Sequence, residues 1–325
     1  MQEVLKEKVI LDVDTGSDDA VAIMAALGSP ELELIGIATV WGNLAVSETT
    51  ANTLALCRAL GSELKVYRGC ERAMVKDFDP FQSFANNYRP IELPDGRVLK
   101  IHYNMLDQLP PCTAEPEPLS AVRFYLETLS LATEPISIIA TGPLSNLGWV
   151  FYLRPDLAEK VGRFYLMGGG RDLSNVSESA EANIWHDAEA LQYILDAGLK
   201  PTIVSLDATH SAALDLQDAA ELRELGSFAG EFTAKMIEQR IEYESTFFNP
   251  KRKWSAIHDA LAVCAFCRPE LVLAAEELSI SPSLEALNYG ELLIDRREAP
   301  EAANARLISR ADKAVFMAYL KELFR

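Results

Sequence analysis

The sequence predicts an α/β protein with a mostly parallel, open sheet flanked by helices: a Rossmann-like core with C-terminal helical and small β insertions. Short, nearly continuous apolar runs of strand length alternate with helical patterns from Lys8 to about Leu206. Strands of this kind, separated by helices, form parallel sheets that are covered on both faces. No internal repeat or low-complexity linker is visible, so we expect a single domain over residues 1–325.

The expected elements follow from these patterns in chain order. The segments predicted to be strands are Lys8–Val13, Leu32–Val40, Lys65–Tyr67, Ile136–Ala140, Arg163–Met167 and Pro201–Leu206. The helical patterns between them are Asp18–Leu27, Val46–Leu60, Leu119–Leu131, Pro143–Tyr152 and Asp187–Asp196. After Leu206 we expect helices at Gln217–Arg223 and Phe228–Tyr243, strands at Leu292–Asp295 and Ala305–Ile308, and a last helix from about Ala311.

One long stretch, Asp77 to Pro118, shows little periodicity and is rich in Pro, Asn, Asp and aromatic residues. Irregular stretches of this length in compact domains are often lids or binding loops, and disorder is the alternative.

Composition and charge limit the classes of function. The formal net charge of -18 disfavours nucleic acid and favours small ligands and cations. No apolar run reaches the ~20 residues that a membrane span needs, and the charged start, Met1–Lys8, does not resemble a secretory signal. Scattered cysteines without framework spacing favour reduced thiols, so we expect a cytoplasmic protein. The pair Cys264 and Cys267 lies in an apolar helical run and is expected to serve packing.

The most informative segment is the start of the chain, where an apolar run ends in the carboxylates Asp12, Asp14, Asp18 and Asp19. Carboxylates at this density repel one another, and a shared cation is the natural way to hold them together. Capping of the following helix would explain Asp18 and Asp19. It would not explain Asp12 and Asp14, which alternate onto one face of the strand. We therefore expect a metal site and an active site at the carboxyl edge of the sheet.

Further polar residues follow other predicted strands: Trp41-Gly42-Asn43, Thr141-Gly142-Pro143-Leu144-Ser145-Asn146, the Gly168-Gly169-Gly170 loop with Asn175, Glu181-Ala182-Asn183, and His258-Asp259. Together with the Asp-x-Asp-x-Gly-x-Asp-Asp start, they resemble the inosine-uridine preferring nucleoside hydrolases, which are calcium-dependent nucleoside N-ribohydrolases. The resemblance runs from Leu11 to about Asp259 in the family's order.

The chemistry of such a site can be stated from the residue types alone. A ribose presents cis hydroxyls that can replace two waters around a hard cation, and Ca²⁺ accepts six to eight oxygens in flexible geometry. Water held by such an ion loses a proton more readily, and a neighbouring carboxylate can accept that proton. Cleavage of an N-riboside passes through an oxocarbenium-like state, which nearby negative charge stabilises.

The resemblance implies a role for each matching residue. Asp14 would bind Ca²⁺ and act as the general base, with Asp19, Asp259 and the carbonyl oxygen of Thr141 completing the metal shell. Asp12 would hold these ligands in place without binding the ion itself. The resemblance also implies the groups that bind the substrate. These are Asp18 for the ribose 2′-hydroxyl, Asn183 for the diol, Asn175 and Glu181 for the 5′-hydroxyl, and Asn43 near the water and the ribose. His258 would protonate the leaving base.

The sequence departs from the family pattern at two places. Thr15 stands where the family usually has Pro, and the stretch after His102 lacks the usual glycines. Aromatic and imidazole side chains that can contact the base are His102, Trp185 and Tyr243, with Phe78, Phe81 and Tyr103 as further stacking candidates. The sequence therefore leaves the base preference open, and the candidate substrates include modified nucleosides. We expect a structural hydrogen bond for His210, and no role follows for His186.

Other classes of function compete with this reading. Asp12 and Asp14 also fit a haloacid-dehalogenase-like phosphatase, but no lysine stands at a strand end to bind phosphate. A non-catalytic, calcium-dependent nucleoside binder would use the same ligands, although it needs no proton donor. Phosphorolysis is disfavoured because an acidic site repels phosphate. The resemblance implies a homodimer or homotetramer that acts on a small-molecule nucleoside, with neither nucleic acid nor membrane as partner.

Overall fold

A computed structural model describes residues 6–76, 91–93, 95–99, 102, 106, 109, 112–247, 249–297 and 302–325 of the chain. The described strands form a central sheet in the order β11-β14-β8-β7-β6-β1-β2-β3, parallel except that β11 runs antiparallel to β14. Their bounds are β1 Glu7–Val13, β2 Leu32–Thr39, β3 Val66–Arg68, β6 Ile136–Ala140, β7 Val161–Met167, β8 Thr202–Val204, β11 Val272–Leu278 and β14 Ala305–Ala311.

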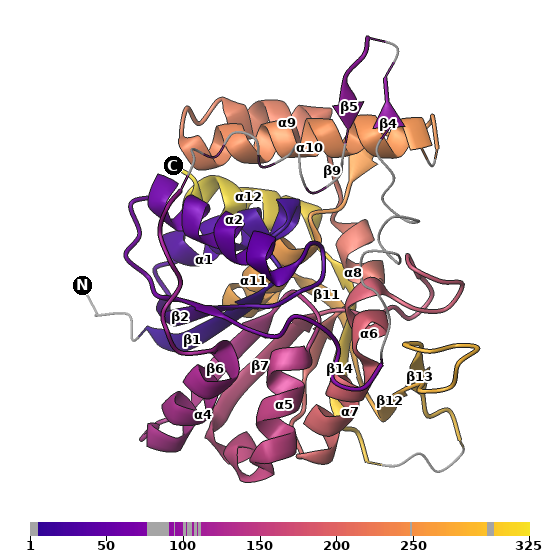
Figure 1. Cartoon of the computed structure of the whole chain (residues 1–325). Helices are drawn as coiled ribbons and strands as arrows, with labels where there is room; N and C mark the ends of the chain where they lie inside the picture. The colour runs from indigo at the N-terminus through magenta and orange to yellow at the C-terminus, as the bar shows by residue number, and fades with distance from the viewer. Residues whose placement is uncertain are drawn as a thin grey trace.

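Helices cover both faces of the sheet (Figure 1). One face is covered by α4 (Ala121–Leu131), α5 (Ser145–Leu153) and α7 (Ala188–Asp196), and the other by α1 (Ser17–Gly28), α2 (Val46–Ala59), α11 (His258–Cys267) and α12 (Lys313–Leu323). Alternate residues of β1 feed the two cores: Val9, Leu11 and Val13 pack with α1 and α11, whereas Ile10 packs with α4 and α5. The fold class predicted from the sequence is thus confirmed.

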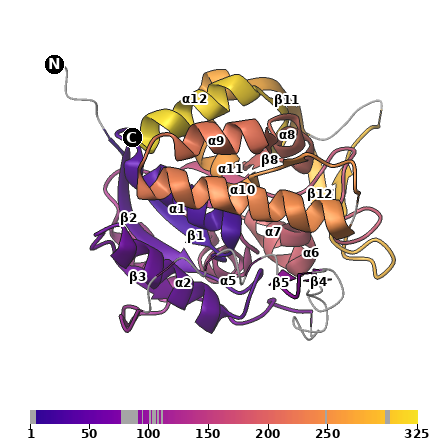
Figure 2. The same ribbon diagram turned by 90° about the horizontal axis from the view of Figure 1, so that it is seen from above.

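An outer layer lies above α1. Helices α9 (Leu216–Arg223) and α10 (Phe228–Phe247) pack together, and α10 crosses over α1 and contacts it (Figure 2). The short strands β9 (Leu214–Asp215) and β10 (Trp254–Ser255) pair beside this layer. A hairpin of β4 (Ile91–Glu92) and β5 (Val98–Leu99) is tied to α10 by an ion pair between Arg97 and Glu242 at 2.9 Å.

The remaining described elements are short. They are the helices α6 (Ala182–His186) and α8 (Leu206–Ser211), the 3₁₀ turns η2 (Pro155–Lys160) and η3 (Pro269–Leu271), and the strand pair β12 (Ile280–Pro282) and β13 (Leu292–Ile294). Among the helices of the described residues, none combines the length and the apolar composition that crossing a bilayer requires.

The order in which the chain adds strands to the sheet reverses at β1, and this reversal positions the site. The chain runs from β1 through β2 to β3 on one side, then returns to the other side of β1 with β6, β7 and β8. Asp12 in β1 pairs in register with Ala140 in β6, which brings the residues that follow the two strands together. Crevices at such a switch point are where open α/β sheets bind ligands.

Two sequence expectations differ from the structure. The predicted strand Pro201–Leu206 ends earlier, because Ser205 caps α8 by accepting a hydrogen bond from the Ala208 N–H. The edge strand β11 has no predicted counterpart, because most of its side chains are only partly buried and its sequence is not a continuous apolar run. Most of the stretch Asp77 to Pro118, including Phe78, Phe81 and Tyr103, lies outside the described residues.

Candidate active site

The turn between β1 and α1 places the first acidic residues. The buried Asp14 follows β1, and its Oδ2 accepts a hydrogen bond from the Asn43 backbone N–H at 2.6 Å. Asp19, in the first turn of α1, accepts bonds from Gly16 N–H at 3.0 Å and from the Thr141 hydroxyl at 2.8 Å. The ends of β1, β2 and β6 therefore hold the two carboxylates through backbone and side-chain donors.

Close approach of the backbone around these carboxylates requires glycine at two positions. A Cβ atom on Gly42 would lie 2.0 Å from Asp14 Oδ2. A Cβ atom on Gly16 would lie 2.4 Å from Nδ1 of His102 and 2.8 Å from Nδ2 of Asn43. Any other residue at either position would displace the groups that surround Asp14.

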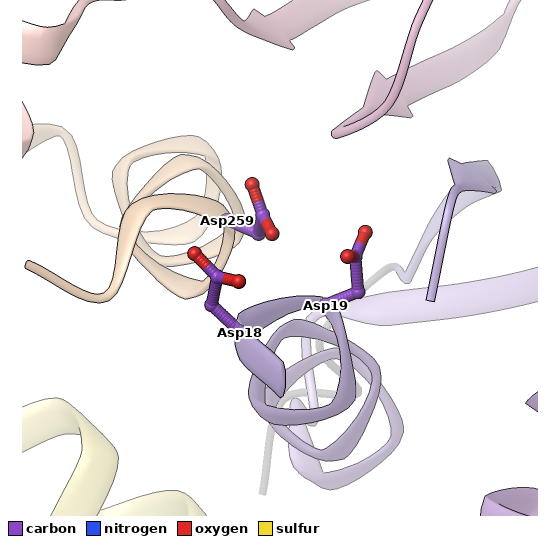
Figure 3. A group of neighbouring side chains, drawn as sticks. All are labelled: Asp18, Asp19 and Asp259. Atoms are coloured by element: carbon purple, nitrogen blue, oxygen red, sulfur yellow. The ribbon is translucent and has the colours of Figure 1, made fainter. Parts of the chain in front are cut away.

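Asp18 and Asp19 from α1 face Asp259 from the first turn of α11 (Figure 3). One carboxylate oxygen from each lies within 4.8 Å of the others. Burial and the neighbouring carboxylates raise the pKa of Asp14 and of Asp259 well above the usual range, and the same causes raise that of Asp19 to about 6. Residues from the turn and helix after β1 and from the start of α11 thus form one strongly acidic cluster.

The cluster fits a hard cation. Asp14 Oδ1 is buried and has no hydrogen-bond partner among the described residues, although a buried carboxylate oxygen is costly to leave unsatisfied. The surrounding donor atoms are carboxylate and carbonyl oxygens, which suit Ca²⁺ or Mg²⁺ rather than a softer metal. A divalent cation would satisfy Asp14 Oδ1 and offset the repulsion that raises these pKa values.

Asp18 differs from the neighbouring carboxylates because it forms an ion pair with a basic side chain. Nη1 of Arg240, on α10, lies 3.1 Å from Asp18 Oδ1, and both side chains are buried. Burial alone would raise the pKa of Asp18, but Arg240, His258 and His102 bring it below the usual value. No sequence pattern predicts Arg240, which is one of several charged residues along α10.

The polar wall opposite the acids is built around Asn183 on α6. Its Nδ2 donates to the Thr141 carbonyl at 2.7 Å and to the Met167 carbonyl at 3.1 Å. Glu181 caps α6 by accepting from the Asn183 N–H, and its other oxygen accepts from Gly169 N–H at 2.8 Å. Burial raises the pKa of Glu181 to about 7. The exposed Asn175 accepts from Ala182 N–H at 2.9 Å, so the strand-end loops are cross-linked.

A second layer of buried polar groups supports this wall. Asn146 Nδ2 lies 3.2 Å from each carboxylate oxygen of Asp12. Trp41 donates from its indole N–H to the Ser145 hydroxyl at 3.0 Å, and Ser145 donates to Asp187 at 2.6 Å. These bonds fix the strand ends that carry Asp14 and Asn43.

His258 opens α11 beside Asp259. Its Nδ1 lies 2.8 Å from the Thr209 hydroxyl, and burial lowers its pKa to about 3, so the ring is neutral near pH 7. The ring of His210 lies 5.8 Å from that of His258 and 5.3 Å from that of Trp254.

The three residues considered for base contact take different places. His102 is buried, lines the pocket and lies against Gly16. Trp185 packs against Gly290 and carries the ammonium of Lys76 4.4 Å above its ring. Tyr243 is fully buried in the core beside α1 and α11. The structure thus brings only His102 of the three to the described pocket lining.

The described lining of the pocket joins several of these groups in one cleft, and Asp14 and Asp19 are not part of that lining. It consists of Asp18, Asn43, His102, Thr141, Met167, Asn175, Glu181, Ala182, Asn183, Arg240, His258 and Asp259. Sequence reasoning missed Met167, Ala182 and Arg240 as lining residues. The position of Met167 before the Gly168–Gly170 loop is the only signal that could have indicated one of them. An acidic cleft at the switch point of a parallel sheet is typical of an α/β enzyme that acts on a small polar substrate.

Comparison with known proteins gives the family. A sequence model described as "Inosine-uridine preferring nucleoside hydrolase" matches residues 9–318. The pyrimidine-specific ribonucleoside hydrolase RihA of Escherichia coli is 29% identical over 273 residues, covering 82% of each chain. The purine-preferring ribonucleoside hydrolase from Gardnerella vaginalis superposes with a TM-score of 0.83, at 29% identity and 98% coverage of both chains. The Bacillus anthracis inosine-uridine preferring nucleoside hydrolase, at 18% identity, shares the fold with a TM-score of 0.77 and 98% coverage of both chains.

The chain therefore belongs to the inosine-uridine preferring nucleoside hydrolase family and is a nucleoside N-ribohydrolase. The family resemblance predicted from the motifs is confirmed.

Proposed function

We propose that the protein uses Ca²⁺ to hydrolyse the N-glycosidic bond of ribonucleosides, releasing ribose and the free nucleobase. The observation that carries this proposal is the buried Asp14, whose Oδ1 lacks a hydrogen-bond partner among the described residues beside three further carboxylates. We also propose a single domain that acts as a homodimer or homotetramer in the cytoplasm.

Asp14, Asp19, Asp259 and the Thr141 carbonyl are the proposed metal ligands. The carboxylate oxygens that lie within 4.8 Å of one another belong to Asp18, Asp19 and Asp259, but Arg240 already pairs with Asp18 Oδ1 at 3.1 Å. When bound, the ion would lower the pKa of a coordinated water and orient the ribose diol. The preference for oxygen ligands in flexible geometry supports Ca²⁺.

Asp14 is the proposed general base. The Asn43 backbone N–H holds Oδ2 at 2.6 Å, which leaves Oδ1 to accept a proton from the attacking water. Negative charge in the cluster would also stabilise the oxocarbenium-like transition state at C1′.

The remaining polar groups are proposed to hold the sugar. Asp18 would accept the 2′-hydroxyl, Asn183 would bind the diol, and Asn175 and Glu181 would bind the 5′-hydroxyl. The hydrogen bonds of Asn183 to the ends of β6 and β7 support this assignment because they fix its orientation.

His258 is the proposed donor to the leaving base. The Thr209 hydroxyl can donate either to the Leu206 carbonyl, at 3.0 Å, or to Nδ1 of His258, at 2.8 Å. Donation to Nδ1 leaves the ring proton on Nε2, from which the neutral imidazole would donate a hydrogen bond to the departing base.

The first experiment incubates purified protein with inosine, adenosine, guanosine, uridine and cytidine, with Ca²⁺ or with chelator, and separates the products by HPLC. We expect free base and ribose only when Ca²⁺ is present. Because RihA is named pyrimidine-specific and the Gardnerella enzyme purine-preferring, both classes of base are needed. Binding of a nucleoside without product would contradict hydrolysis and indicate a calcium-dependent binder.

A second experiment tests His258 with two leaving groups. His258→Asn should lower kcat for inosine or uridine by about 10²–10⁴. It should leave cleavage of 4-nitrophenyl riboside nearly unchanged, because nitrophenolate departs without a proton. Equal losses on both substrates would contradict the donor role.

The haloacid-dehalogenase alternative is not supported by the structure. Its nucleophile would be Asp12, which is only 2% exposed and has both oxygens within hydrogen-bond distance of Asn146. A nucleophile held in this way cannot reach a substrate in the cleft.

A further inference from the structure

Arg240 is a buried cation at the edge of the acidic cluster. Only 5% of its surface is exposed. Its Nη1 lies 3.1 Å from Asp18 Oδ1 and donates to the Ser17 hydroxyl at 3.1 Å, while Nε donates to the Ser255 hydroxyl at 3.1 Å. The guanidinium is therefore held by residues of α1 and β10 at a fixed place beside Asp18.

A second ion pair, with Glu244, also holds Arg240 in place. Glu244, one turn further along α10, accepts from the Ser255 hydroxyl at 3.0 Å and lies 3.8 Å from Nε of Arg240. Its other oxygen is 2.7 Å from Nε of Arg252, which stacks over the Trp254 ring. Charges of alternating sign thus run from Asp18 outward, which makes movement of Arg240 toward another partner costly.

The distances between the carboxylate oxygens do not by themselves decide which of them would bind a cation. Asp18, Asp19 and Asp259 present oxygens within 4.8 Å of one another, so a cation could draw Asp18 into its shell. Among these three, only Asp18 forms an ion pair with a basic side chain within the described part of the structure. A guanidinium bound to one carboxylate lowers the attraction of that carboxylate for a metal ion and repels the ion directly.

We propose that Arg240 is a positioning residue that keeps Asp18 out of the metal shell and aims it at the ribose 2′-hydroxyl. Arg240 thereby weakens Ca²⁺ binding and strengthens selection of ribonucleosides over 2′-deoxyribonucleosides. The part concerning ribose rests on the proposed function; the part concerning Ca²⁺ does not require turnover.

The test compares Arg240→Met, Arg240→Lys and wild type, with Arg223→Met as control. Arg223 also pairs with two glutamates, Glu231 and Glu238, but lies on α9 outside the pocket lining. Titration calorimetry measures Ca²⁺ affinity without nucleoside. Steady-state kinetics then give kcat/KM for a ribonucleoside and its 2′-deoxy analogue at saturating Ca²⁺.

For Arg240→Met we expect Ca²⁺ to bind about tenfold more tightly, because a repelling charge is lost and Asp18 becomes available to the ion. The ratio of kcat/KM for ribose over 2′-deoxyribose should fall by about tenfold, as expected when a hydroxyl contact is lost. Arg240→Lys keeps the charge and should retain the wild-type Ca²⁺ affinity. Arg223→Met should leave both quantities unchanged. A purely structural role would instead weaken Ca²⁺ binding.

Unchanged or weaker Ca²⁺ binding by a folded Arg240→Met would overturn the proposal, as would an unchanged selectivity ratio. If that variant does not fold, Asp18→Asn and Asp19→Asn replace it. The proposal requires Asp18→Asn to weaken Ca²⁺ binding much less than Asp19→Asn, and equal losses would overturn it. Wild-type protein that binds Ca²⁺ but cleaves no nucleoside would contradict the proposed function separately, while the affinity shift would still test Arg240.

Discussion

The acidic half of the site and the proposed base half are built in different ways. The acidic half consists of Asp14, Asp18, Asp19, Thr141 and Asp259, which stand at strand ends and at the starts of α1 and α11. The base half comprises the proposed base contacts His102, Trp185 and Tyr243, which lie outside the central sheet, and only His102 of these lines the described pocket.

We expect the fold to set the geometry of the acidic half and peripheral elements to set the choice of base. Pairing of β1 with β2 and β6 sets the places of Asp14 and Thr141. Among the described residues, none of the paired strands of the central sheet contains His102, Trp185 or Tyr243.

The largest effect is expected for Asp14→Asn. Loss of the base should lower kcat by about 10²–10⁴ for every nucleoside. The neutral amide removes repulsion within the buried cluster, so the Tm of the metal-free protein should not fall. Stopped assays and thermal unfolding check both statements, with the exposed Asp172→Asn as control. A loss confined to some bases would contradict the proposed division between the two halves.

A smaller loss is expected for Asn183→Ala. The variant gives up the bonds to the Thr141 and Met167 carbonyls and the proposed contact with the diol. Removing such contacts costs about 1.5–3 kcal/mol, or roughly tenfold to a hundredfold in kcat/KM. The ranking of the bases should stay the same, because the contact is with the sugar. An unchanged kcat/KM would remove the ribose-binding role.

Trp185→Leu should act on the base half alone. The substitution removes the ring beneath Lys76 and the packing against Gly290. We expect kcat/KM to change unequally among purine and pyrimidine nucleosides, by about twofold to tenfold, which corresponds to the usual value of an aromatic contact. Ca²⁺ affinity measured by calorimetry should not change. A uniform fall across all bases would place Trp185 with the acidic half.

The smallest effect is expected for Tyr243→Phe. Tyr243 is fully buried in the core, and the exchange keeps the ring and removes only the hydroxyl. The free energy of unfolding should fall by about 0.5–1.5 kcal/mol. Denaturant titration measures this change, and the nucleoside ranking should stay as in wild type. An altered ranking would show that Tyr243 contacts the base.

Sequence reasoning placed the central strands because they are apolar and short, and the acidic motif because four carboxylates crowd one strand end. Edge strand β11 was missed because an edge needs little continuous apolar sequence. Arg240 could not be found, because its position depends on how α10 crosses α1, which only tertiary packing determines. The need for Gly42 also follows from a close approach, here to Asp14, that leaves no trace in a single sequence.

The acidic cluster joins residues 14–19 with residue 259, and this separation has a kinetic consequence. Contacts between distant parts of a chain are slow to form, because loop-closure entropy must be overcome first. We therefore expect the cation site to assemble late, after the folding transition state. A ligand that binds only the completed site slows unfolding without speeding folding. Calcium would then govern how long the folded enzyme survives rather than how quickly it forms.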